Sequence, residues 1–139
     1  MFDIREPDPS TDALANSVIG AAIEVHRHLG PGFLEDVYEE AMAIEMELRQ
    51  IPFERQKHIA VDYKERVVGR GRLDFLVGDQ LVVELKSVTA IAPIEVARVI
   101  SYLRAYRRDL ALVINFNVRI LKDGIQRVVV SGRPPRVET

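Results

Sequence analysis

The chain contains no cysteine. Disulfide bonds and thiolate metal sites are therefore excluded, and any metal ion must be held by oxygen ligands or by the three histidines. Oxygen ligands of this kind favour Mg²⁺, Mn²⁺ or Ca²⁺ over structural zinc.

Long apolar runs and a strong charge of one sign are also missing. No apolar run reaches transmembrane length, and the opening MFDIREPDPSTD is acidic without an apolar core, so we expect no signal peptide and a cytoplasmic protein. The net charge of −2 is unlike that of a dedicated non-specific nucleic-acid binder. The length of 139 residues suits one domain, 1–139, with a polar arm over 1–9 and a loose tail over 132–139.

The basic residues are clustered despite the mild net charge. Arg98, Arg104 and the pair Arg107-Arg108 lie in one segment, and Arg70 and Arg72 precede the most conspicuous apolar stretch. A local basic groove is one interpretation. Solvated helix faces are the other, which we favour for Arg107-Arg108.

Periodicity predicts eight elements in the order ααβββαββ. The helices are expected from Ser10–Asp12 to Leu29, from Leu34 to Arg49 and from Ile94 to Arg107; the strands are expected over Phe53–Asp62, Val67–Val77, Leu81–Val88, Leu110–Phe116 and Ile125–Val130. This order indicates an α/β (α+β-like) fold with a central mixed sheet flanked by helices.

Apolar residues at helical spacing predict which helix faces are buried. In the first helix, His26 lies beside the stripe and is expected to be structural. In the second helix the predicted core face comprises Leu34, Val37, Tyr38, Ala41, Ile44 and Leu48.

The stretch Leu73–Val88, LDFLVGDQLVVELKSV, sets charges into two apolar strands. Asp74 lies in the first strand, and Glu84 and Lys86 lie in the second, where residues i and i+2 share one face. A buried unpaired charge is costly, so it neutralises, pairs or binds a metal. The pattern is suited to a divalent cation held by carboxylates beside an ammonium group.

This interpretation carries a condition on the hairpin. Asp74 shares a face with Glu84 only if the loop has an odd length, such as Gly78-Asp79-Gln80, or if a β-bulge intervenes. A two-residue loop would send Asp74 to the opposite face. The alternative is a half-buried hairpin with Glu84 and Lys86 as a solvated pair, which the spacing alone favours.

A family resemblance adds to these patterns. The stretch Gly32–Tyr38 spells G-x-x-E-x-x-Y, follows IGAAIEVHRHLGPG and precedes RLDFLV, VVELKSV and INFNV in that order. Over about Ala13 to Val130 the chain resembles the GxxExxY family, a branch of the PD-(D/E)XK nuclease superfamily. The resemblance implies a restriction-endonuclease-like core and metal-dependent phosphodiester hydrolysis with Mg²⁺ or Mn²⁺.

The resemblance also implies roles for individual residues. Catalytic positions fall on Glu35, Asp74, Glu84 and Lys86, with Asp74, Glu84 and Glu35 as metal ligands. Tyr38, Arg98 and Tyr102 would bind the phosphate backbone of the substrate, although arginine replaces the glutamine that often stands at the position of Arg98. That arginine either holds a phosphate or pairs with Glu84 or Asp74 and closes an inactive site.

Three functions follow as alternatives. The first is a nuclease acting on nucleic acid, DNA before RNA. The second is a catalytically inactive nuclease-fold module for binding or regulation, and the third is a structural oligomerisation domain whose charges pair with one another. A homodimer is plausible, since one basic face of so small a domain would cover little duplex.

Overall fold

A five-stranded mixed sheet forms the centre of the protein, with strand order β1-β2-β3-β4-β5. The structure is a computed structural model that describes residues 7–130. Its strands are β1 (Phe53–Tyr63), β2 (Arg66–Val77), β3 (Leu81–Lys86), β4 (Leu110–Asn115) and β5 (Ile125–Val129). Its helices are α1 (Pro9–Leu29), α2 (Glu35–Leu48), α3 (Pro93–Tyr106) and the short 3-10 helix η1 (Leu121–Gly124). Apart from η1, this order confirms the predicted ααβββαββ arrangement.

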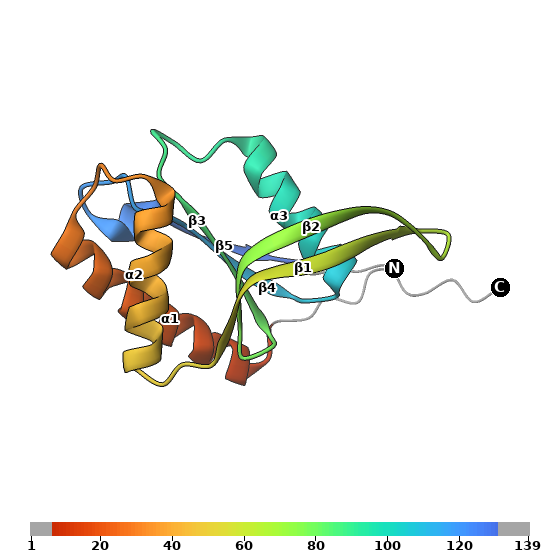
Figure 1. Ribbon diagram of the computed structural model, residues 1–139, viewed down its shortest axis with the longest axis horizontal. Coiled ribbons are helices and arrows are strands. Elements are labelled where there is room, and N and C mark those ends of the chain that lie inside the picture. The colour runs from red at the N-terminus through yellow and green to blue at the C-terminus, as the bar shows by residue number, and fades with distance from the viewer. Residues whose placement is uncertain (1–6, 131–139) are drawn as a thin grey trace.

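Helices cover the sheet on both faces (Figure 1). One core cluster joins α1 and α2 to Leu81, Val83 and Leu85, and the other joins α3 to Val82 and Val113. Strand β4 is buried along its whole length, as its apolar run predicts. It pairs in parallel with β3 through the α3 crossover, whereas all other neighbouring strands are antiparallel.

The outer part of the β1–β2 hairpin projects beyond the body of the protein (Figure 1). Its tip turns at Lys64 and Glu65, which have φ values of 48° and 67°, as a two-residue turn with positive φ at both positions requires. Helix α3 packs against the base of this projection, where Ile59 and Leu73 join the α3 cluster. The hairpin therefore extends the sheet past α3.

Helix α1 begins earlier than its sequence suggests. Asp8 is the N-cap, and its carboxylate accepts a hydrogen bond from the Ser10 backbone N–H at 2.9 Å, with Pro9 at the first helical position. The predicted cap at Ser10–Asp12 is therefore wrong. Pro9 of the predicted arm is helical, whereas Pro7 and Asp8 precede the helix. The rest of that arm and the tail over 132–139 lie outside the described residues. His26 is structural as predicted, with Nε2 2.7 Å from the Val118 carbonyl oxygen.

The predicted core face of α2 is largely wrong. Tyr38, Met42 and Met46 are buried, whereas four of the predicted residues are exposed: Leu34, Val37, Ile44 and Leu48. Both sets recur at helical spacing, so α2 is apolar on two faces and periodicity alone cannot say which of them meets the sheet. The tertiary packing selects the face that contains both methionines.

Within residues 7–130, no helix combines the length and the apolar character that crossing a bilayer requires.

Candidate active site

The turn between β2 and β3 meets the condition for a shared carboxylate face. Val77 pairs with Leu81 and Phe75 with Val83, so the loop consists of Gly78, Asp79 and Gln80. Continuing this register places Asp74 opposite Glu84. The odd loop length that the metal-site interpretation requires is thus confirmed.

The carboxylates of Asp74 and Glu84 each accept a hydrogen bond from a backbone N–H of the opposite strand. The Leu85 N–H donates to Asp74 Oδ2 at 2.8 Å, and the Asp74 N–H donates to Glu84 Oε1 at 3.4 Å. In a regular antiparallel ladder, backbone N–H groups donate to carbonyl oxygens of the neighbouring strand. Here these two N–H groups donate to carboxylate oxygens instead. The two strands separate at this point, and two acidic side chains lie between them.

Glu84 is only 9% exposed. Burial raises its pKa, and the charge of Asp74 and a hydrogen bond with the Asp74 side chain raise it further; the Asp74 backbone N–H and Lys86 act in the opposite direction. Together they bring the pKa of Glu84 to about 9. Without a cation, Glu84 therefore holds a proton at neutral pH, and a bound cation would replace that proton.

Lys86 has a partner that the sequence did not suggest. Its Nζ lies 3.8 Å from Glu95 Oε1, and its side chain is 19% exposed. The other oxygen of Glu95 accepts a hydrogen bond from the Ala92 N–H at 3.0 Å, which fixes the carboxylate at the start of α3. An acid at the third position of a helix that begins at Pro93 is a sequence signal for this cap, but not for its contact with a lysine on β3.

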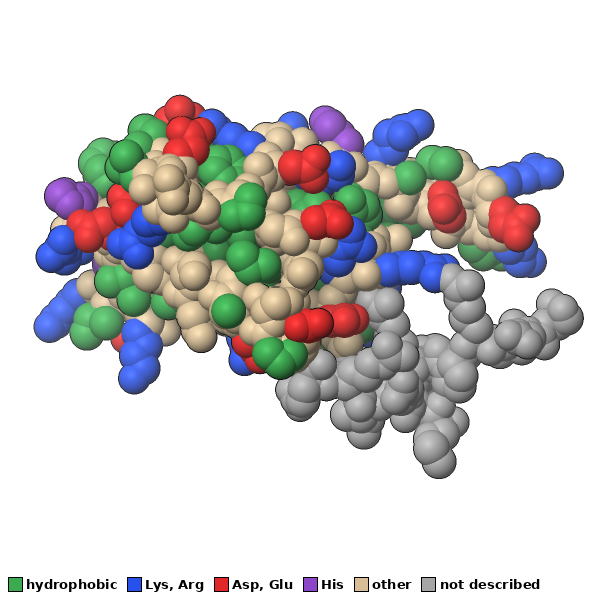
Figure 2. Space-filling view, turned by 90° about the horizontal axis from the view of Figure 1, so that it is seen from below, with side chains coloured by type: hydrophobic (Ala, Val, Ile, Leu, Met, Phe, Trp, Pro, Cys, Tyr) green, Lys and Arg blue, Asp and Glu red, His purple; other side chains and the backbone are tan. Residues whose placement is uncertain are grey.

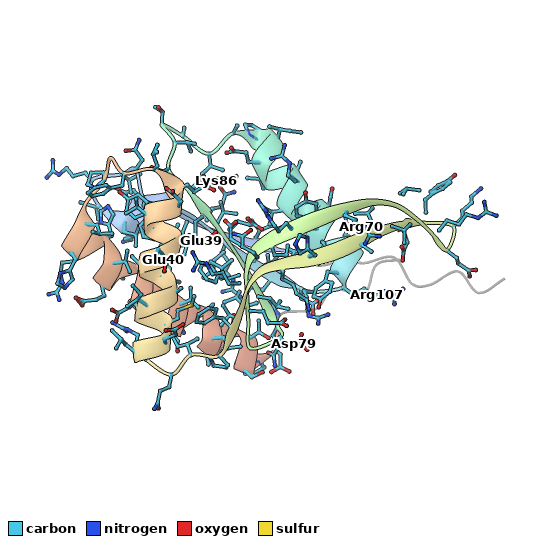
Figure 3. The ribbon with its side chains drawn as sticks, in the orientation of Figure 1. Glu39, Glu40, Arg70, Asp79, Lys86 and Arg107 are labelled. Atoms are coloured by element: carbon cyan, nitrogen blue, oxygen red, sulfur yellow. The ribbon has the colours of Figure 1, made fainter. Side chains whose placement is uncertain are left out.

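Glu35 is the first residue of α2 and lies near the same group. Partial burial raises the pKa of its carboxyl; Lys86 opposes this shift, while Asp74, Glu95 and Glu39 add to it. These charges show that Glu35, Asp74 and Lys86 lie within electrostatic range of one another. Glu35 is exposed, so it lies at the open side of the site. Figure 3 shows Lys86 between the ends of α2 and α3.

Tyr38 does not fit its predicted contact with substrate. The side chain is fully buried, and its ring stacks on Phe116 with centroids 4.5 Å apart. Its hydroxyl donates to the Gly30 carbonyl at 2.6 Å and accepts from the Phe33 N–H at 3.2 Å. Tyr38 therefore fixes the loop that leads into Glu35, and its role is to position that loop.

Arg98 and Tyr102 both lie on α3 but in different surroundings. Arg98 is exposed and forms no ion pair with any residue of the described range 7–130. Of its two alternatives, the pairing with Glu84 or Asp74 that would close the site is therefore not formed. Tyr102 lines a cavity of about 400 Å³ together with Asp74, His58, Gly71, Arg70 and Arg72. Tyr102 therefore adjoins the carboxylate site.

The approach of Tyr102 to β2 gives a testable prediction. A Cβ at Gly71 would lie 2.8 Å from Tyr102 Cε1, whereas a Cβ at Gly69 would meet nothing within 4 Å. Gly71→Ala should therefore displace the half-buried ring of Tyr102 and destabilise the protein by about 1 kcal/mol, and Gly69→Ala should not. Urea unfolding of both variants checks this, and equal midpoints for the two would contradict it.

Comparison with protein families gives a match over residues 12–128 to a model described as the PD-(D/E)XK nuclease superfamily. The chain belongs to the PD-(D/E)XK nuclease superfamily. Comparison with curated proteins gives no match. The superfamily assignment agrees with the mixed sheet and its flanking helices, and the narrower GxxExxY branch stays a prediction.

The donors of this PD-(D/E)XK site suit a hard divalent cation. Asp74 and Glu84 offer carboxylate oxygens, and the side-chain oxygen of Gln56 on β1 is buried without a hydrogen-bond partner in the described part of the chain. No three Asp, Glu, His or Cys side chains among residues 7–130 lie close enough to hold an ion together. Two carboxylates with neutral oxygens are a donor set that Mg²⁺ accepts, because this ion usually keeps several water ligands.

Proposed function

We propose that the protein is a metal-dependent nuclease that hydrolyses phosphodiester bonds in nucleic acid, DNA before RNA. The observation that supports this most is the hairpin register, which brings Asp74 and Glu84 together in a superfamily of nucleases, with Lys86 following on the same strand. The raised pKa of Glu84 adds support, since a carboxyl that is protonated without a cation becomes a charged ligand when one binds.

The residues divide into ion-holding and water-orienting groups. Asp74 and Glu84, with the Leu85 carbonyl, would hold Mg²⁺ or Mn²⁺, which supplies charge stabilisation for the phosphate and a lower pKa for attacking water. Lys86, kept in place by Glu95, would orient that water or accept its proton. Glu35 at the open side would accept a hydrogen bond from a second water or hold a second ion. Tyr102 would contact the phosphate backbone.

The pairing of basic residues supports a polyanionic substrate. Arg27, Arg49 and Arg55 on and around α1 and α2 are paired with glutamates. Arg70 and Arg72 form no ion pair within residues 7–130, and they line the cavity beside Asp74. Figure 2 shows Lys and Arg side chains along the projecting hairpin, interspersed with a few acids. Arg70 and Arg72 therefore lie where a phosphate backbone would leave the site.

These cations give a second prediction. The double variant Arg70→Ala, Arg72→Ala should weaken nucleic-acid binding at low salt and reduce the slope of log K against log salt by about 2, because each phosphate contact contributes about 1. Arg27→Ala, which removes an arginine already paired with Glu24, is the matched control. Fluorescence anisotropy over a salt series measures the affinity and the slope for both variants. An unchanged slope in the double variant would contradict a path of the phosphate backbone past Arg70 and Arg72.

Calorimetric titration of Mn²⁺ into the metal-free protein tests the proposed function. The wild type should bind in the micromolar to low millimolar range, and Glu84→Gln should not bind. Cleavage of branched, single-stranded and duplex substrates would then be screened with the wild type. Absence of Mn²⁺ binding would point instead to the catalytically inactive binding module. The homodimer and the cytoplasmic location stay predictions.

A further inference from the structure

Gln56 has an unusual backbone conformation for a strand residue. Its φ is 55°, in the left-handed region, although it lies in β1. The register is the same on both sides of it, with Arg55 opposite Phe75 and Lys57 opposite Leu73. No residue is therefore inserted, and the peptide is rotated at this one position. Such a conformation in a non-glycine residue costs free energy and is concentrated at functional sites.

The rotated residue lies next to the carboxylate pair. The register places Gln56 opposite Asp74, which in turn lies opposite Glu84. The alternation of side chains between the two faces of the sheet is also interrupted here. Leu73 and Phe75 are two residues apart and would share a face in a regular strand, but Leu73 packs in the α3 cluster while Phe75 packs in the cluster of α1 and α2. The rotation at Gln56 and the separation of β2 from β3 at Asp74 thus occur in one row across three strands.

The side chain of Gln56 is held at one end only. Its Nε2 donates to the Glu39 carboxylate on α2, and Arg55 Nε donates to the other oxygen of Glu39 at 2.8 Å. Its Oε1 is buried and has no hydrogen-bond partner among the described residues. A buried carbonyl oxygen without a partner is destabilising, so this position invites a donor or a cation.

Glu39 also connects Gln56 to the rest of the site. It lies four residues after Glu35 on α2, so the two side chains share a helix face, and its charge raises the pKa of Glu35. Figure 3 shows Glu39 on the side of α2 that faces the hairpin. The bond to Glu39 therefore keeps the amide of Gln56 on the side where Glu35 and Asp74 approach each other.

We infer that Gln56 is a further positioning residue of the site: its side-chain oxygen is a neutral acceptor for the hydrated divalent cation that Asp74 and Glu84 hold. The left-handed backbone sets the direction of the side chain, and Glu39, itself held by Arg55, accepts a hydrogen bond from the amide nitrogen. The amide oxygen is thereby left available, and it would accept a hydrogen bond from a water of the bound ion. The inference rests on the proposed function, because it requires a cation at Asp74 and Glu84. Outer ligands of this kind typically change metal affinity by about 10- to 100-fold.

Gln56→Gly separates this role from a purely structural one. Glycine adopts positive φ without strain and leaves no unsatisfied oxygen, so the thermal midpoint of the metal-free protein should be equal to or above that of the wild type. The dissociation constant for Mn²⁺, measured by calorimetry, should rise by about tenfold or more. Gln50→Gly is the matched control, because Gln50 has a φ of 58° at the exposed end of α2 and should leave the affinity unchanged.

A second variant tests the reach of the amide. Gln56→Asn keeps the amide and tolerates positive φ, but it withdraws the oxygen by one methylene, so Mn²⁺ affinity should fall here as well. Wild-type affinity in either variant would overturn the inference while leaving the proposed function intact. Failure of the wild type itself to bind Mn²⁺ would overturn the proposed function and the inference together.

Discussion

Glu84→Gln is expected to abolish Mn²⁺ binding and, at the same time, to stabilise the metal-free protein at alkaline pH. In the folded wild type the pKa of Glu84 is about 9, against an ordinary value of 4.5. Each unit of such a shift corresponds to ~1.4 kcal/mol, so the ionised form costs the folded state several kcal/mol. Glutamine retains the shape of the protonated acid and never ionises.

The direction of the pH dependence follows from proton binding. Between about pH 5 and 9 the folded protein holds a proton on Glu84 that the unfolded chain has released, so this group's contribution to the free energy of unfolding falls as pH rises. The difference between Glu84→Gln and wild type should therefore be small at pH 5 and grow to roughly 20 °C in thermal midpoint at pH 9.

Thermal unfolding in EDTA at pH 5, 7 and 9 measures this difference. Glu54→Gln is the matched control, because Glu54 lies on strand β1 of the same sheet with its side chain 58% exposed and should give a curve parallel to that of the wild type. A difference between Glu84→Gln and wild type that does not change with pH would contradict the protonated state. Mn²⁺ affinity of the wild type should rise with pH over the same interval, since the ion displaces the proton.

Lys86→Met is expected to lower the rate of cleavage by about 10²- to 10⁴-fold, the contribution typical of a residue that moves or orients a proton. Mn²⁺ affinity should change only slightly, because Lys86 offers no ligand to a cation and Asp74 and Glu84 remain. Methionine keeps much of the aliphatic length of the half-buried lysine, so the strand should stay folded. The loss should therefore appear in the rate and not in metal affinity.

Single-turnover cleavage alongside Mn²⁺ calorimetry checks this division. Lys57→Met is the matched control, since Lys57 is also a partly buried strand residue paired with a glutamate, at 3.4 Å from Glu54. Its rate should equal that of the wild type. Full activity in Lys86→Met would remove Lys86 from the mechanism and move the water-orienting role to Glu95 or Glu35.

The residues that are predicted most clearly are those whose role follows from their immediate neighbours in the sequence. Asp74, Glu84 and Lys86 stand out because charges in apolar strands need a partner or a ligand, and the loop Gly78-Asp79-Gln80 restricts the register to two simple alternatives. Strand β4 was predicted as doubly buried for a similar reason, since its six residues are all apolar except Asn115.

The residues that were missed depend on contacts between distant segments. Glu95 and Gln56 have ordinary local explanations, as a helix cap and a polar strand residue, and only the packing of α3 and α2 against the sheet brings them to the site. The family resemblance implies that Tyr38 contacts the substrate, whereas its hydroxyl is hydrogen-bonded to the backbone of Gly30 and Phe33.

The sequence by itself determined the order of elements and the buried central strands, because hydrophobic periodicity operates over a few neighbouring residues. The cost of burying charge singled out Asp74 and Glu84, but the sequence left open whether their side chains share a face. Only the tertiary structure decided which of the two apolar faces of α2 meets the sheet, that Arg98 stays unpaired among residues 7–130, and that Gln56 adopts a left-handed backbone beside Asp74. Those outcomes depend on which surfaces pack against one another in the folded chain. When a local sequence pattern is compatible with two packing arrangements, the pattern alone does not show which of them forms.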